Sequence, residues 1–125
     1  MNTVINISSS LKDYLEAIYS LSRGTGEVRI TDVAAYLSIS KPSTNRAVKN
    51  LKNLGLVNHE HYGNITLTPL GENLGREFHN RHKMITSFLV SVLKVPYETA
   101  KNDAASIEHD LSSDTINGMM SYMQG

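Results

Sequence analysis

The sequence predicts a mainly α-helical protein, in which a winged helix-turn-helix is followed by a second, helical lobe. Apolar residues recur at helical spacing in several segments, and two β-prone runs flank a Gly-Asn turn. Before these runs, the sequence predicts a short helix, a tight turn and a further helix that ends at a glycine. The 125 residues can bury a real core in one domain or two small lobes. We divide them into residues 1–70 and residues 71–125.

Composition excludes several classes of protein. Hydrophobic residues make up 40% and charged residues 19% of the chain, which is typical of a globular protein and argues against disorder. Cysteine is absent, so disulfide frameworks, thiolate metal sites and cysteine nucleophiles are excluded. No apolar run approaches the roughly 20 residues that span a bilayer, and the N-terminus lacks a signal-peptide pattern. We therefore expect a cytoplasmic protein without a membrane partner.

The first expected helix follows the serines at positions 8–10, one of which can cap it. It should stop near residues 23–24, where Gly24 and Gly26 act as breakers. Its apolar face consists of Leu11, Tyr14, Leu15, Ile18 and Tyr19.

The second and third helices are expected on either side of a tight turn at residues 38–41. Thr31 or Asp32 caps the second helix. Pro42 suits the first turn of the third, where its missing N–H is harmless, and this helix should end at residue 54, before a glycine. Their apolar positions are Val33, Ala34, Leu37, Ala47, Val48, Leu51 and Leu54.

A hairpin is expected next, because the β-prone runs 56–61 and 65–68 flank a Gly-Asn turn. His59, His61 and Tyr62 lie in or beside this wing. Two histidines on one face of a strand can bind metal, but exposed residues near backbone phosphates are the better interpretation.

The second lobe is expected to be entirely helical. Pro69 opens a long helix over about residues 70–93, and Pro96 breaks the chain. Residues 112–114 cap a last short helix over about 115–123. The helix between them carries an apolar stripe of Ala100, Ala104, Ile107 and Leu111.

The start of the third helix has the chemistry of a DNA-recognition helix, because its first turn carries small polar side chains. Asn45 can bind adenine, Ser43 and Thr44 can bind either base, and Pro42 can touch a thymine methyl group. Ordinary helix capping and a solvated face is the competing interpretation, and the neighbouring helix, turn and hairpin outweigh it. The expected DNA-binding residues are Arg29, Lys41, Pro42, Ser43, Thr44, Asn45, Arg46 and Lys49.

Charge supports this assignment weakly. The net charge is zero, but residues 29–52 carry five basic residues and one acidic residue, a net charge of +4. Residues 96–125 carry one basic and five acidic residues, a net charge of −4. The first segment suits phosphate and the second suits cations, although chance asymmetry is common in small proteins.

Several segments together resemble the diphtheria toxin repressor family of metal-dependent regulators, and most closely its manganese transport regulator branch. The resemblance covers about residues 11–123 and implies a homodimer that represses metal-uptake genes by binding a palindromic operator in double-stranded DNA when a divalent cation is bound. The segments that carry it are Asp13-Tyr14-Leu15-Glu16-Ala17-Ile18-Tyr19, Ile39-Ser40-Lys41-Pro42-Ser43, Ile65-Thr66-Leu67-Thr68-Pro69-Leu70-Gly71, Arg81-His82 and Ile107-Glu108-His109-Asp110-Leu111-Ser112.

The resemblance implies metal roles for Asp13, Glu16, His82, Glu108 and His109. Carboxylates and imidazoles without thiolates favour manganese, Mn²⁺, with Fe²⁺ or Zn²⁺ as the other candidates. Without the resemblance, helical periodicity assigns the two acidic residues of the first helix to a solvated face, and a lone histidine in a long helix to an ordinary polar position.

Two positions depart from the family pattern. Ala105 stands where the manganese branch has a glutamate that bridges two metals, on the helix face expected to carry Glu108 and His109, and Thr86 replaces an ancillary glutamate of the iron branch. The number of ions therefore stays open, and a winged-helix regulator that no longer requires metal is the alternative. No enzyme is expected, because the sequence has no nucleophile elbow and no His-Glu-x-x-His motif, and no small organic substrate is implied.

Overall fold

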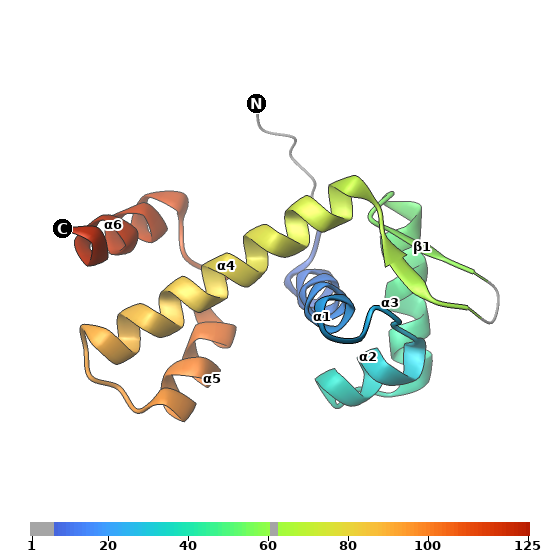
Figure 1. The fold of residues 1–125 in the computed structure, drawn as a ribbon, viewed down its shortest axis with the longest axis horizontal. Helices are drawn as coiled ribbons and strands as arrows, with labels where there is room; N and C mark the ends of the chain where they lie inside the picture. Colours follow the sequence, from blue (N-terminus) through green and yellow to red (C-terminus); the bar gives the residue numbers. More distant parts are fainter. Residues whose placement is uncertain (1–6, 61–62) are drawn as a thin grey trace. The chain divides into compact units, whose positions relative to one another are not determined.

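The computed structural model describes residues 7–60 and 63–125 (Figure 1). Within that part, the chain forms helices and one antiparallel hairpin, as the sequence predicts. It divides into two compact units, residues 1–76 and 77–125. The long helix α4 (Pro69–Ser91) contributes residues 69–76 to the first unit and 77–91 to the second. None of the helices described is long and apolar enough to cross a bilayer.

The first unit is built around α1 (Ser9–Thr25), which packs against the next two helices and the second strand of the hairpin. Ser8 caps it by accepting a hydrogen bond from the Leu11 N–H at 3.2 Å, as expected from the serine run. The expectation that Gly24 breaks the helix is wrong. The helix continues through this residue to Thr25, and Gly26 closes it with a left-handed φ of 77°.

The second helix, α2 (Ile30–Leu37), begins earlier than expected. Arg29, not Thr31 or Asp32, occupies the N-cap position. The Asp32 carboxylate accepts a hydrogen bond from the Arg29 N–H at 2.9 Å, so it stabilises this end from inside the first turn. A single residue in the left-handed region, Ser38 with φ of 56°, then turns the chain.

The third helix, α3 (Lys41–Asn53), is capped by Ser40, whose hydroxyl accepts from the Ser43 N–H at 3.2 Å. Ala47, Val48 and Leu51 are buried as expected. Leu54 is 40% exposed, because it lies at the C-cap, where the chain turns toward Gly55.

The wing consists of β1 (Val57–His59) and β2 (Ile65–Leu67), paired in the register Val57–Leu67, Asn58–Thr66 and His59–Ile65. The Val28 carbonyl accepts a hydrogen bond from the Ile65 N–H at 2.7 Å and ties the wing to the segment before α2. His61 and Tyr62, expected at the wing, lie outside the described residues.

A close approach joins the wing to the start of α4. The Thr68 hydroxyl donates to the Gly55 carbonyl at 2.7 Å and accepts from the Gly71 N–H at 3.1 Å. A Cβ at Gly71 would overlap the Leu56 carbonyl oxygen, so only glycine fits here without a shift. The core of this unit consists of Ile7, Tyr14, Leu15, Ala17, Ile18, Tyr19, Val28, Val33, Ala34, Ala47, Val48, Leu51, Leu56, Val57 and Ile65.

The second unit contains the remainder of α4, α5 (Tyr97–Ile107) and α6 (Ser113–Gln124). Ser112 caps α6 by accepting from the Thr115 N–H at 3.2 Å. The core of the second unit contains the cluster Ile85, Ala104 and Ile116, with Met84, Leu89, Ile107, Leu111 and Met119 packed around it; Phe78 and Ala100 are buried as well.

Candidate functional site

Two groups of polar side chains, one in each unit, and one apolar groove are the candidate functional features. The first group follows the exposed side of α3. Lys41, Pro42, Asn45, Arg46 and Lys49 are all exposed. A helix that presents an amide and three cations on one exposed side has the composition needed to approach the bases and phosphates of DNA.

The expectation that Thr44 contacts a base is wrong, because the structure buries this residue completely, at 0% exposure. Its hydroxyl donates to the Ser40 carbonyl at 2.9 Å, inside the first turn of α3. The neighbouring Ser43 is half-buried and accepts a hydrogen bond from the Arg46 guanidinium at 3.2 Å. Ser43 therefore helps to orient the arginine.

Arg29 lies in a second part of the same unit, beside the wing. It is exposed and pairs with Glu27 at 3.0 Å. With Ile30, Thr31, His59 and Gly63 it lines an open hollow of about 350 Å³. Thr31 was expected only as a cap, and the structure places it with His59 in the lining of one hollow although the two residues lie far apart in the sequence.

The second group belongs to the second unit and brings two expected metal ligands together. His82 of α4 and Glu108, at the C-cap of α5, lie 3.0 Å apart between Nδ1 and Oε1, although 26 residues separate them. Their ligand atoms are close enough to share one ion. His109 follows directly, and its ring packs edge-to-face on Phe78 with centroids 5.7 Å apart.

Glu108 has the environment expected of a metal ligand. Its side chain is 1% exposed, and Oε2 has no hydrogen-bond partner among the residues described. Leaving a buried polar atom unsatisfied costs about 1–3 kcal/mol, and more when the group is charged. Buried carboxylates in proteins are usually paired with a positive charge or coordinate a metal, so this oxygen is suited to bind a cation.

The remaining expected ligands, Asp13 and Glu16, lie in the first unit on α1. They are three residues apart, which places them one turn apart on neighbouring positions of the helix surface. Asp13 is exposed and Glu16 is half-buried. The full set of oxygen and nitrogen donors suits Mn²⁺, Fe²⁺ or Zn²⁺.

The expectation that Ala105, Glu108 and His109 share one helix face needs correction. The helix α5 ends at Ile107, so Glu108 lies at its C-cap and His109 in the following turn; Glu108 is buried, whereas Ala105 is exposed within the helix. Thr86 offers no ligand either, because its hydroxyl donates to the His82 carbonyl at 2.9 Å.

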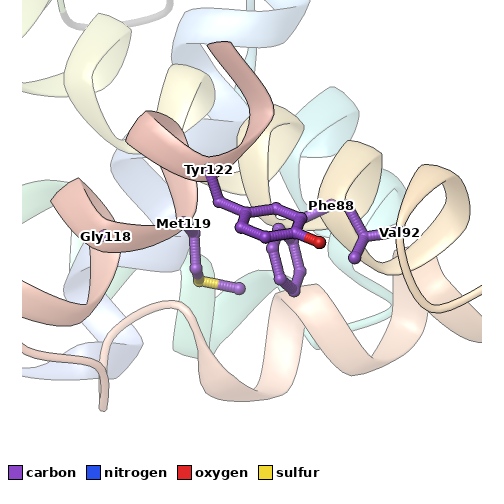
Figure 2. A pocket seen from close by; sticks show the side chains of 5 residues that line it. All are labelled: Phe88, Val92, Gly118, Met119 and Tyr122. Carbon is purple, nitrogen blue, oxygen red and sulfur yellow. The ribbon is translucent and has the colours of Figure 1, made fainter. Parts of the chain in front are cut away.

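An apolar groove on the second unit is the third feature (Figure 2). It has a volume of about 280 Å³ and is lined by Phe88, Val92, Gly118, Met119 and Tyr122. The rings of Phe88 and Tyr122 meet edge-on at 6.2 Å, yet Tyr122 is 68% exposed. Further large apolar side chains exposed in this unit are Leu93, Tyr97, Met120 and Met123. Exposed apolar surface of this kind is typical of a protein interface.

Comparison with known proteins finds two family models that match consecutive parts of this chain. The sequence model of the iron-dependent repressor N-terminal DNA-binding domain matches residues 6–65. The model of the iron-dependent repressor metal-binding and dimerisation domain matches residues 68–125.

Individual relatives are similar over most of the chain. The transcriptional regulator MntR of Salmonella typhimurium is 36% identical over 91% of this chain and 72% of its own length. The regulator MntR of Lysinibacillus sphaericus is 36% identical over 92% of this chain and 82% of its own.

Solved structures support the fold. The manganese regulator SloR has a TM-score of 0.81 at 25% identity and covers 91% of this chain. A manganese-dependent transcriptional repressor in complex with manganese has a TM-score of 0.85 at 23% identity over 91%. The chain spans about half the length of these structures, 53% and 52%.

Proposed function

Because this chain belongs to the iron-dependent repressor family, the metal-dependent regulators that include the diphtheria toxin repressor, we propose that it represses metal-uptake genes in response to a divalent cation. It binds a palindromic operator as a homodimer, and it acts in the cytoplasm, where the DNA is. Residues 1–70 form the DNA-binding domain and residues 71–125 the domain for dimerisation and metal binding.

The observation that carries the metal dependence is the Glu108 carboxylate. It is buried, faces His82 at 3.0 Å, and keeps one oxygen without a hydrogen bond among the described side chains and backbone groups. A regulator that had lost its metal would gain stability by replacing this residue with an apolar one, because the unsatisfied oxygen is costly. The structure therefore favours a metal-dependent regulator over the metal-independent alternative.

We propose that His82, Glu108 and His109 hold the cation together with Asp13 and Glu16 of α1. When bound, the cation supplies positive charge that carboxylates from both units can share. Asp13 and Glu16 then couple α1 to the second unit. Since α1 packs against α2 and α3, a change in the position of α1 is transmitted to the recognition helix.

DNA recognition depends on the exposed side of α3. Asn45 reads a base edge, while Lys41, Arg46 and Lys49 bind phosphates and fix the register. Pro42 and Ser43 lie beside them, and Arg29 adds a phosphate contact near the wing. One such surface covers one half-site, so two copies must place their recognition helices about 34 Å apart, one turn of DNA.

The apolar groove of the second unit is the proposed contact between the two copies. Burying Tyr122 and its exposed apolar neighbours against a second chain removes surface that a monomer leaves in water. Since the contact is between identical surfaces, it generates the two-fold symmetry that a palindromic operator requires.

The experiment that tests this function combines metal titration with operator selection. The metal-free protein is incubated with a randomised duplex library in the presence of Mn²⁺, Fe²⁺, Zn²⁺ or EDTA, and bound duplexes are sequenced. We expect a palindromic sequence to be enriched with at least one metal and not with EDTA. Equal enrichment with EDTA would support the metal-independent alternative, and no enrichment under any condition would contradict repressor function.

A further inference from the structure

Arg81 contacts the backbone of the buried metal ligand Glu108. The guanidinium Nη1 donates to the Glu108 carbonyl at 3.4 Å, and Nη2 lies 3.9 Å from the Glu77 carboxylate one turn earlier on α4. The side chain is only 20% exposed, so most of this long cation is withdrawn from water. The next residue, His82, contacts the side chain of the same glutamate. Two consecutive residues of α4 thus hold Glu108 by its backbone and by its carboxylate.

The place where Arg81 acts is a helix end. The backbone of α5 ends at Ile107, Glu108 is the C-cap, and its N–H donates to the Ala104 carbonyl at 3.0 Å. Carbonyl groups at the end of a helix have no partner within the helix, and arginine side chains are suitable donors to them. Such ends fray when they are not held. Here the helix end that Arg81 contacts carries Glu108 and is followed directly by His109.

The positive charge of Arg81 allows two roles of this side chain to be distinguished by experiment. A guanidinium beside a cation site opposes cation binding by Coulomb repulsion. Removing its charge alone should therefore strengthen metal binding. If Arg81 instead holds the ligand-bearing turn in position, removing it should weaken metal binding. The two roles predict opposite signs.

We propose that Arg81 is a positioning residue of the metal centre, which fixes the turn at residues 108–110 so that Glu108 and His109 are ready for the cation. This inference rests on the proposed function for the identity of the ligand, but the contact itself is a property of the metal-free chain. The guanidinium repels the cation, but it also keeps Glu108 and His109 ordered before the cation binds. The two residues therefore lose less conformational entropy on binding, which offsets the repulsion.

The test compares Arg81→Met, which keeps an unbranched apolar stem and removes the donors, with Lys83→Met. Lys83 is exposed two residues further along α4 and loses the same charge, so it is a matched control. Mn²⁺ affinity is measured by calorimetry. We expect Arg81→Met to weaken Mn²⁺ binding by about 10-fold, the range typical of groups that orient a ligand. Lys83→Met should leave the affinity unchanged or slightly stronger.

A second readout does not need metal. The amides of Asp110 and Leu111 donate to the Ile107 carbonyl at 2.9 and 3.2 Å, so their hydrogen exchange reports on the turn. We expect their exchange in the metal-free protein to be at least about 5-fold faster in Arg81→Met than in Lys83→Met. If the wild type binds none of the metals, the proposed function fails, while this exchange measurement still tests the contact.

Arg81→Lys keeps the proposal testable if the methionine variant does not fold. It retains the charge with a single donor group and should show intermediate affinity and intermediate exchange. A general loss of stability would lower the melting temperature without changing the affinity of the folded protein. Unchanged or tighter Mn²⁺ binding in both Arg81 variants would overturn the proposal, as would unchanged exchange at the two amides.

Discussion

Replacing Glu108 with glutamine separates metal binding from stability, because the two should move in opposite directions. The substitution keeps the size of the side chain and removes its charge. In the folded protein the carboxylate is 1% exposed, with one oxygen 3.0 Å from His82 and the other without a hydrogen bond among the described residues. Glutamine is a far weaker ligand for a hard cation than carboxylate is.

The size of the effect on metal binding can be calculated. A metal present at 100 times its dissociation constant stabilises the wild type by about 2.7 kcal/mol. For a chain of this length that corresponds to a rise in Tm of about 8–16 °C. If the substitution raises the dissociation constant about 100-fold, the same metal concentration supplies only about 0.4 kcal/mol, which is about 1–2 °C.

The metal-free protein should respond in the other direction. Glutamine removes a buried charge whose second oxygen is unsatisfied, so the free energy of unfolding without metal should equal or exceed that of the wild type, by up to about 1 kcal/mol. Asp110→Asn is the matched control, because it removes the same charge from an exposed side chain two residues further on. It should change neither quantity.

Thermal unfolding followed by circular dichroism, with EDTA and with Mn²⁺, measures both effects. Loss of stability by more than about 1 kcal/mol in EDTA would show that the carboxylate stabilises the metal-free fold. A full metal-induced rise in Tm in the glutamine variant would show that Glu108 is not a ligand. Either result refutes the reasoning.

Three further predictions concern DNA, the wing and assembly. Asn45→Ala should reduce the free energy of operator binding by about 1–3 kcal/mol and relax the preference at one base position. Lys49→Ala should weaken binding to all sequences and lower the slope of log binding constant against log salt concentration by about one. Equal loss of specificity in both variants would contradict this assignment. Gly71→Ala should destabilise by about 3 kcal/mol or more in denaturant titration, because its Cβ overlaps a backbone oxygen, while Gly24→Ala, whose Cβ meets nothing within 4 Å, should be neutral or stabilising. Tyr122→Glu should shift the sedimenting species from dimer to monomer, and a monomeric wild type at micromolar concentration would exclude the proposed interface.

The fold could be predicted because its elements are local. Helical spacing, serine caps and prolines placed the helices close to their observed bounds, and the Gly-Asn turn placed the hairpin. The start of α2 was misplaced by two or three residues. Asp32 stabilises the start of α2, but it does so from the first turn, by accepting a hydrogen bond from the N–H of the N-cap residue Arg29. The sequence alone does not distinguish this arrangement from one in which the aspartate is itself the N-cap.

The burial of Thr44 is predicted by helical periodicity, although its polar side chain suggests a place on the DNA-binding surface. It precedes Ala47, Val48 and Leu51 by three, four and seven residues, the spacing of one helix face. The structure buries all four. The threonine hydroxyl is satisfied by the carbonyl four residues earlier, so its burial leaves no donor unpaired. The pattern that would have placed it in the core was present in the sequence.

The proposed metal ligands, by contrast, could not be located from local sequence patterns. His82 and Glu108 meet across 26 residues of chain, and no local pattern encodes that distance. A resemblance could nominate them, but only the fold shows a carboxylate that is buried with an unsatisfied oxygen. Sequences optimised for stability alone replace such groups by apolar residues, and natural proteins keep them where function requires them. Glu108 is buried directly after the last residue of α5 and has an oxygen without a hydrogen bond among the described residues, so its presence favours a functional role over a purely structural one.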